Sequence, residues 1–343
     1  MTMKKVAFII AQNFQDEEGV SPFKFLTENK IKVEYIGLKK GECKGKYGRE
    51  KVKIAKTFED VSAADYDGVI IPGGAAPEIL RCDEKALDFV KHFINNDKLV
   101  AAICHGPQVL ISTGLMAGRH LTSYVGIRDD LRFAGAVYSD EATLQDDKII
   151  TARTPDDLET FNHAILWALT QEDGHFTKSE LTKEITPTAA LKIAIRKEIT
   201  ANVFYGVMAR SSKNENLSSK FMFLAANERD HITFCQTALK QMTRGLVYTN
   251  SNLFNHTNFA KDISNLPLKD VLNYSMEAEK EANALYTAAA KRASGAGMKK
   301  LFNMLASEEQ GHMQMIEIEM HSNEPRSSNS AIEMIPYNMA DQW

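Results

Sequence analysis

One cysteine stands where the sequence could place a nucleophile. Cys104 follows the apolar run "LVAAI" and precedes "HGPQVLISTG", so a buried strand should end at the thiol and a helix should begin just after it. The positive end of a helix lowers the pKa of a thiol and favours the thiolate. His105, the next residue, can accept or donate a proton. We therefore predict a nucleophilic Cys104, although a single cysteine often only fills space in a core.

Two other turns should lie at the same edge of the sheet, because parallel strands gather ligands where they end. Gly73 and Gly74 in "IIPGGAAPE" follow another strand, and their backbone N–H groups could bind an oxyanion. The segment "NFQDEEGVSPF" supplies carboxylates just after the first strand. The other three cysteines lack this context and are predicted to be packing or surface residues; they are Cys43, Cys82 and Cys235.

A second chemical pattern repeats late in the chain. The stretch "EITANVFY" aligns with "EKEANALY", and "FMFLAANERDH" aligns with "FNMLASEEQGH", at one constant offset of 81 residues. Four pairs share this offset: Glu198 with Glu279, Tyr205 with Tyr286, Glu228 with Glu309, and His231 with His312. A third Glu-x-x-His match, Glu172 to His175, has no partner in this register. The repeat indicates an internal duplication of a helix pair.

The repeated residue types indicate a metal centre. Residues at i and i+3 share a helix face, so each Glu-x-x-His pair can bind one site, and the two tyrosines lie two turns along from Glu198 and Glu279. Four carboxylates inside an apolar bundle need compensation, and two divalent cations supply +4 against −4. One Glu from each of two helices plus Glu-x-x-His from each of the other two is the ligand set of di-iron carboxylate proteins. The alternative is an amphipathic bundle whose glutamates face water. By the same register, Glu308 aligns with Asn227 and is predicted to be a surface residue.

The elements that must position these residues form two domains. Strand-like and helix-like segments alternate through residues 1–170, which predicts an α/β three-layer sandwich of the flavodoxin-like kind with a mostly parallel sheet. A polar linker is expected at 171–187, and an all-α, ferritin-like four-helix bundle at 188–321, with a tail at 322–343. The four helices are expected at 187–212, 216–243, 267–294 and 297–321, with no convincing strand between Pro187 and His321.

Composition narrows the class of protein. The chain has 343 residues and a formal net charge of −4, which argues against broad nucleic-acid binding. No apolar run approaches the ~20 residues of a membrane span, so no membrane partner is expected. Four scattered cysteines fit a reducing cytoplasm rather than a disulfide framework.

Residues 4 to 170 resemble the ThiJ/PfpI family, a branch of the class I glutamine amidotransferase-like fold. The motifs are "AAICHGPQVL", "PGGAAPE", "FQDEEGVSP" and "GRHLTSYVGIRDDL". The resemblance implies that Glu18 is hydrogen-bonded to the Cys104 thiolate, that His105 is the base, and that Glu78 orients His105 across a homodimer interface. Glu17 is then a solvated charge. Val125 stands where many relatives have proline.

Residues 187 to 321 resemble the ferritin-like superfamily, nearest the rubrerythrin and bacterioferritin-like branch. The likeness implies two iron ions bridged by carboxylates and reacting with oxygen or peroxide, with manganese or zinc also compatible. Rubrerythrins often carry a four-cysteine iron domain, which this sequence lacks, so turnover would need an external electron donor. Ala282 stands where some rubrerythrins have an extra carboxylate.

The two resemblances together imply a stress-response fusion. One half would be a glyoxalase-, deglycase- or peptidase-like cysteine hydrolase acting on a small aldehyde or on a glycated or peptide substrate, and the other a di-iron oxidase or peroxidase. One alternative is a redox sensor or chaperone in which Cys104 is oxidised reversibly and the bundle stores metal. Another is that the bundle is a dimerisation scaffold with no metal.

Overall fold

The computed structural model describes residues 3–170, 186–249 and 266–322, which form two compact units. The first unit contains residues 3–170 together with 243–249, and the second contains 186–242 and 266–322. Residues 171–185 of the predicted linker, residues 323–343 of the predicted tail and the isolated Glu172–His175 match lie outside the described residues. Each unit is described by itself below.

The first unit is built on an eight-stranded sheet with the strand order β12-β10-β11-β7-β6-β1-β2-β5. Every neighbouring pair is parallel except the β10–β11 hairpin. Its strands are β1 (Lys5–Ile9), β2 (Lys32–Gly37), β5 (Lys56–Thr57), β6 (Gly68–Ile71), β7 (Leu99–Ile103), β10 (Thr143–Asp146), β11 (Ile149–Ala152) and β12 (Leu246–Thr249). Two smaller sheets pair β3 (Gly41–Lys44) with β4 (Lys51–Ile54) and β8 (His120–Leu121) with β9 (Val137–Tyr138).

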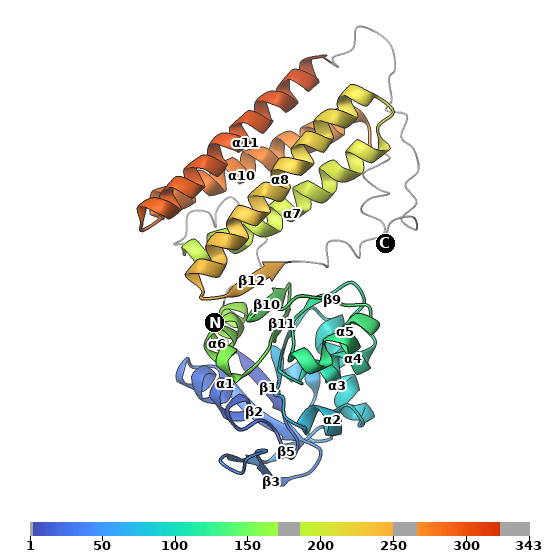
Figure 1. Ribbon diagram of the computed structural model, residues 1–343, viewed down its shortest axis with the longest axis vertical. Helices are drawn as coiled ribbons and strands as arrows, with labels where there is room; N and C mark the ends of the chain where they lie inside the picture. The colour runs from blue at the N-terminus through green and yellow to red at the C-terminus, as the bar shows by residue number, and fades with distance from the viewer. Residues whose placement is uncertain (1–2, 171–185, 250–265, 323–343) are drawn as a thin grey trace. The chain divides into compact units, whose positions relative to one another are not determined.

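Helices cover both faces of this sheet (Figure 1). They are α1 (Asp16–Glu28), α2 (Ala76–Leu80), α3 (Glu84–Asn95), α4 (Pro107–Thr113), α5 (Arg128–Phe133) and α6 (Leu158–Thr170). Strand β1 shows how the layers form, because successive side chains of a strand point to opposite faces. Phe8 packs in the core that α1 and α6 cover, whereas Ile9 packs in the core that α3 and α4 cover. The predicted three-layer α/β sandwich is confirmed.

Strand β12 departs from the prediction that no strand occurs between Pro187 and His321. It pairs in parallel with β10, with Leu246 opposite Thr143 and Thr249 opposite Asp146, so it forms an edge of the first unit's sheet. Leu246 and Tyr248 are buried. The alternation that marks a half-buried strand is therefore present in "LVYT", but four residues inside a polar, Asn-rich stretch are too few to reveal it.

The second unit is a bundle of four long helices, as predicted (Figure 1). They are α7 (Pro187–Ser211), α8 (Glu215–Met242), α10 (Leu268–Arg292) and α11 (Ala296–Ser322), each within two residues of its predicted ends. Thr186 caps α7 by accepting a hydrogen bond from the Ala189 N–H, and Pro187 occupies the first turn. Within the described residues, no helix has the length and mean hydropathy that crossing a membrane requires.

Candidate active site and candidate metal centre

Cys104 sits on a sharp turn between β7 and α4. Its φ of +61° is uncommon for a residue other than glycine, and such strain persists only where neighbours enforce it. Its N–H donates to the Ala152 carbonyl at 2.9 Å, and its own carbonyl accepts from Tyr124 N–H at 3.0 Å. The turn that contains Gly73 lies close to the turn that contains Cys104. Only glycine allows this approach, because a Cβ on residue 73 would lie 2.7 Å from the Cys104 Cβ. The predicted strand–turn–helix placement of the thiol is therefore what the structure shows.

Glu18 lies buried beside the thiol. Gly73 N–H donates to Glu18 Oε2 at 2.8 Å, whereas Oε1 makes no hydrogen bond of normal geometry. Burial raises the pKa of Glu18 to about 7. This contact corrects one prediction: Gly73 is not an oxyanion donor, because its one N–H is already donated to Glu18. The N–H groups of His105 and Gly74 interact with the Cys104 sulfur instead.

The thiol pKa moves opposite to the predicted direction. Burial and the neighbouring Glu18 carboxylate raise the pKa of Cys104 to about 12, and together they outweigh the backbone N–H groups that lower it. The prediction from the helix end alone was wrong because it left out the burial of the thiol, which is the larger cause, and the charge of Glu18 beside it.

His105 is the second group at the thiol. Its Nδ1 lies 3.3 Å from Cys104 Sγ, and its ring stacks on Tyr124 with centroids 4.7 Å apart. Burial lowers the pKa of His105, which favours the neutral imidazole that a base requires. Glu78, exposed on α2, raises that pKa by its charge. Its predicted role across a homodimer interface stays a prediction. Tyr124 had no assigned role in the sequence, because a ring stack depends on tertiary packing.

The six predicted metal ligands converge inside the bundle. Two groups of four are buried, and within each group the candidate ligand atoms lie within 4.8 Å of one another. The first is Glu198, Glu228, His231 and Glu309; the second is Glu228, Glu279, Glu309 and His312. Glu228 and Glu309 belong to both groups. The alternative, a bundle whose glutamates face water, is wrong for these residues.

The shared glutamates lie between the two imidazoles. Glu228 places one oxygen 3.1 Å from His231 Nδ1 and the other 3.2 Å from His312 Nδ1. Glu309 places Oε1 3.1 Å from His231 Nδ1 and Oε2 3.1 Å from His312 Nδ1. Glu198 approaches only His231, at 3.5 Å, and Glu279 only His312, at 3.4 Å. Two carboxylates, those of Glu228 and Glu309, therefore face both imidazoles, and the carboxylates of Glu198 and Glu279 face one imidazole each.

The donor set fits two cations. Both oxygens of Glu228, Oε1 of Glu309 and Nδ1 of His231 are buried without a well-formed hydrogen bond. Burial raises the pKa of Glu279 to about 8. Although burial opposes it, contact with Glu228, Glu279 and Glu309 raises the pKa of His312 to about 12. Buried carboxylates and imidazoles with unpartnered atoms facing one another are the donor set that two divalent ions would satisfy.

The two predicted tyrosines join opposite halves of the repeat. Tyr205 on α7 donates to Glu279 on α10, and Tyr286 on α10 donates to Glu198 on α7. The sequence placed each tyrosine on the face of its own helix's glutamate, but each bonds the glutamate of the other helix. A further repeated contact joins the helices within each half, where the amides of Asn202 and Asn283 donate to Ala225 and Ala306 carbonyls.

Glu308 is exposed, as the register predicts for a surface residue, but it also has a contact that the register does not show. Its Oε2 accepts a hydrogen bond from His231 Nε2 at 2.6 Å. That bond leaves Nδ1 of His231 aimed at the glutamates, as an outer carboxylate does for a metal-binding imidazole. The residue at the equivalent place in the other half, Asn227, instead donates to Phe223 of its own helix. The 81-residue register could not show the Glu308–His231 contact, because the two copies of the repeat have different residues at this position.

Comparisons with known proteins agree with the two resemblances found in the sequence, one for the α/β unit and one for the helical bundle. The DJ-1/PfpI family model matches residues 4–168, and the Rubrerythrin model matches residues 189–320. YraA of Bacillus subtilis (strain 168) is 48% identical over 164 residues, covering 48% of this chain and 96% of that protein. Deglycase PfpI of Pyrococcus furiosus is 40% identical over 154 residues, covering 45% of this chain and 92% of that protein.

A solved two-domain protein from Anabaena variabilis contains DJ-1/ThiJ/PfpI-like and ferritin-like domains. It is 24% identical, covers 96% of this chain and 98% of its own, and has a TM-score of 0.47. The chain thus belongs to the DJ-1/PfpI family through residues 4–168 and joins to that domain a ferritin-like domain matched by the rubrerythrin model.

Proposed function

We propose that this chain is a stress-response enzyme with two centres. Cys104 would act as the nucleophile of a deglycase- or glyoxalase-type reaction on a small aldehyde or a glycated amine. The bundle would hold two iron ions and react with oxygen or peroxide. The observation that supports the second centre best is that Glu228 and Glu309 each face both His231 and His312.

The contacts of Cys104 suit addition to a carbonyl group. When Glu18 takes the thiol proton, the sulfur can form a bond to the carbonyl carbon, and the carbonyl oxygen gains the negative charge. The N–H groups of Gly74 and His105, which interact with the sulfur, are the donors near that oxygen. When the C–N bond of a glycated amine then breaks, the proton that Glu18 took from the thiol would return to the leaving nitrogen, with His105, 3.3 Å from the sulfur, as the group that relays it.

The test of this centre is the Cys104→Ala variant of the full chain. We expect loss of turnover with methylglyoxal and with a glycated amine, and no change in metal content. Cys82→Ala is the matched control, because Cys82 is an exposed cysteine of the same unit. Full activity in Cys104→Ala would refute the nucleophile.

The test of the metal centre is anaerobic loading with Fe²⁺, followed by metal analysis. We expect about two ions per chain, as the two groups of four predict, with consumption of peroxide when an electron donor is present. When bound, the iron ions would supply the electron transfer, and the six side chains named above would hold them. Negligible metal after loading would instead favour the scaffold role of the bundle.

Reversible oxidation of Cys104 without turnover is the alternative, a sensor or chaperone. The thiol is 8% exposed, and burial and the Glu18 carboxylate raise its pKa. Sensing and catalysis both need the thiolate; what favours catalysis is that Glu18 and His105 both lie beside the sulfur and can move its proton. Mass spectrometry after mild peroxide treatment separates the two: a thiol-reversible adduct on Cys104 in a chain with no turnover would support sensing.

The proposal includes a homodimer in which Glu78 of one copy faces His105 of the other. Sedimentation of the full chain tests the assembly. Glu78→Gln tests the contact, since it should lower turnover without changing metal content.

A further inference from the structure

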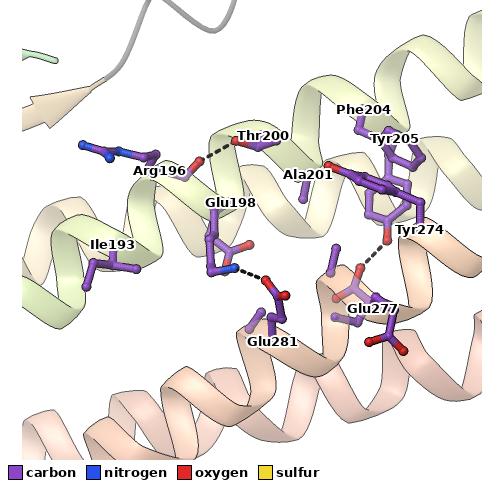
Figure 2. A pocket seen from close by; sticks show the side chains of 14 residues that line it. Ile193, Arg196, Glu198, Thr200, Ala201, Phe204, Tyr205, Tyr274, Glu277 and Glu281 are labelled. Carbon is purple, nitrogen blue, oxygen red and sulfur yellow. Dashed lines mark hydrogen bonds and ion pairs between the residues drawn. The ribbon is translucent and has the colours of Figure 1, made fainter. Parts of the chain in front are cut away.

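A pocket of about 330 Å³ opens between α7 and α10 (Figure 2). All its lining residues belong to these two helices, whereas His231 and His312 belong to α8 and α11. The pocket lining includes Glu198 and Glu279, the two unshared carboxylates of the candidate centre. A molecule in this pocket would therefore lie against both halves of the centre at once. Neither the proposed reaction at Cys104 nor the proposed binding of iron uses this pocket.

Small residues create the pocket. Ala201 on α7 and Ala282 on α10 both line it and occupy equivalent places in the repeat, 81 residues apart. Ala282 is the position where some rubrerythrins have an extra carboxylate, so a larger side chain there would project into this space. Each half of the duplication thus contributes an alanine to the pocket, whereas the aromatic residues Phe204 and Tyr205 line it from α7 without their repeat equivalents.

The size of the pocket points to an organic molecule rather than to oxygen or peroxide alone. A water molecule has a share of liquid volume of about 30 Å³, so the space is about ten times larger. An apolar cavity of about 150 Å³ is enough to bind benzene. Pockets for small ligands begin near 300 Å³. A single substituted ring is the size that fits.

The lining favours a neutral molecule with an aromatic body. The rings of Phe204 and Tyr274 lie 4.9 Å apart along one wall, and Tyr205 is also part of the lining. The charged residues of the lining outside the centre balance, with Arg196 and Lys197 on α7 and Glu277 and Glu281 on α10. Lys197 and Glu281 form an ion pair of 2.7 Å across the two helices.

The chemistry of the centre also calls for such a molecule. Reducing peroxide to water takes two electrons and two protons. The four cysteines of the chain are too scattered to form a four-cysteine iron site, and Cys235 alone belongs to the bundle. A donor from outside the chain would have access to the candidate centre here, since the pocket adjoins two of its carboxylates.

We propose that the α7–α10 pocket binds a small neutral dihydroxybenzene, which serves as the electron donor of the centre; this rests on the proposed function of the bundle. The ring would lie against Phe204 and Tyr274, with a hydroxyl group directed to the carboxylates of Glu198 and Glu279. The reaction is hydroquinone plus hydrogen peroxide giving benzoquinone plus two water molecules. Hydroquinone loses two electrons and two protons, and the O–O bond of peroxide breaks as it gains them.

The first experiment measures binding apart from redox activity. The full chain is loaded with Zn²⁺, which does not change oxidation state, and titrated with hydroquinone by calorimetry and by saturation-transfer NMR. For a ligand of this size, largely buried, we expect a dissociation constant on the order of 0.1 to 1 mM. Ala201→Phe, which fills the pocket, should weaken binding at least tenfold. Ala284→Phe is the matched control on the exposed side of α10 and should bind as the parent does.

The outcomes separate this proposal from the one on which it rests. Absence of saturable binding to the zinc-loaded parent, or equal binding by Ala201→Phe with intact metal content, overturns the pocket assignment. In the iron-loaded chain, hydroquinone should speed peroxide consumption in the parent and in Ala284→Phe but not in Ala201→Phe. If the iron-loaded chain consumes peroxide but hydroquinone does not speed the reaction, the proposed electron-donor role of hydroquinone is refuted, while the proposed function of the metal centre is not. An iron-loaded chain inert to peroxide would refute the proposed function, whereas binding to the zinc form would still support the pocket.

Discussion

Replacing Glu18 by glutamine should make the α/β unit more stable, and more so as the pH rises. The carboxylate is fully buried, and one of its oxygens accepts from Gly73 N–H at 2.8 Å while the other lacks a normal hydrogen bond. Glutamine has nearly the same shape and keeps an acceptor for Gly73. It removes only the charge, so the comparison isolates what the buried carboxylate costs the folded state.

The size of the effect follows from the pKa of Glu18. Burial raises it from the ordinary value of 4.5 to about 7. A raised carboxyl pKa means that the folded chain holds its proton more tightly than the unfolded chain, so stability falls as pH rises from about 4.5 through 7 and then stays low. At 1.36 kcal/mol per pKa unit, the cost is about 2 kcal/mol at pH 6 and about 3 kcal/mol at pH 8. Glutamine does not titrate, so its advantage over glutamate should grow by about 1 kcal/mol between these pH values.

Urea unfolding at pH 6 and pH 8 measures this difference. Trp167 lies in α6, so tryptophan fluorescence follows the α/β unit when the other tryptophan is removed by Trp343→Phe in every protein compared. Glu28→Gln is the control, because Glu28 is exposed on the same helix, does not contribute to the Glu18 shift and should show no such growth. A stability gain equal at both pH values would contradict a raised pKa for Glu18. Turnover at Cys104 should fall in the same variant, since glutamine cannot take the thiol proton.

Further predictions concern the bundle. Glu309→Ala removes a ligand that both groups share and should reduce bound metal from about two ions to below one per chain, whereas Glu279→Ala should leave about one, as metal analysis would show. Glu308→Gln should weaken metal binding about 10- to 100-fold by loosening His231, and Asn227→Ala should not, as chelator competition would show. Because the pKa of His312 without metal is raised to about 12, protons compete with the ions, so metal affinity should fall steadily from pH 8 to pH 6 in the same competition assay.

The parts of the molecule that could be predicted are those set by local periodicity. The helix ends of the bundle agree with the apolar spacing, and the i, i+3 spacing brought each Glu-x-x-His pair onto one face. The repeat supplied the remaining information, since it chose Glu279 from three glutamates within five residues. A pattern that occurs twice in one chain acts as its own alignment, which explains why the metal ligands could be placed together from sequence alone.

The parts that could not be predicted depend on contacts distant in sequence. The Gly73 N–H is taken by Glu18, 55 residues away, and no local pattern shows that competition. Burial of the thiol, and after it the charge of the same carboxylate, reverse the direction expected for the Cys104 pKa. Strand β12 is stable only because β10 provides its partner, so its four residues look like part of a polar connection when read alone.

The duplication also explains why the two halves of the metal centre need not be alike. It fixed the six ligands and the paired tyrosines symmetrically, because both copies must satisfy the same buried charge. Around them the two copies differ: Glu308 lies behind His231, whereas Asn227 stands at the equivalent place in the other copy. A carboxylate behind an imidazole makes that imidazole a more basic ligand. An ion at the His231 end would therefore be held more tightly than one at the His312 end, although both ends share Glu228 and Glu309.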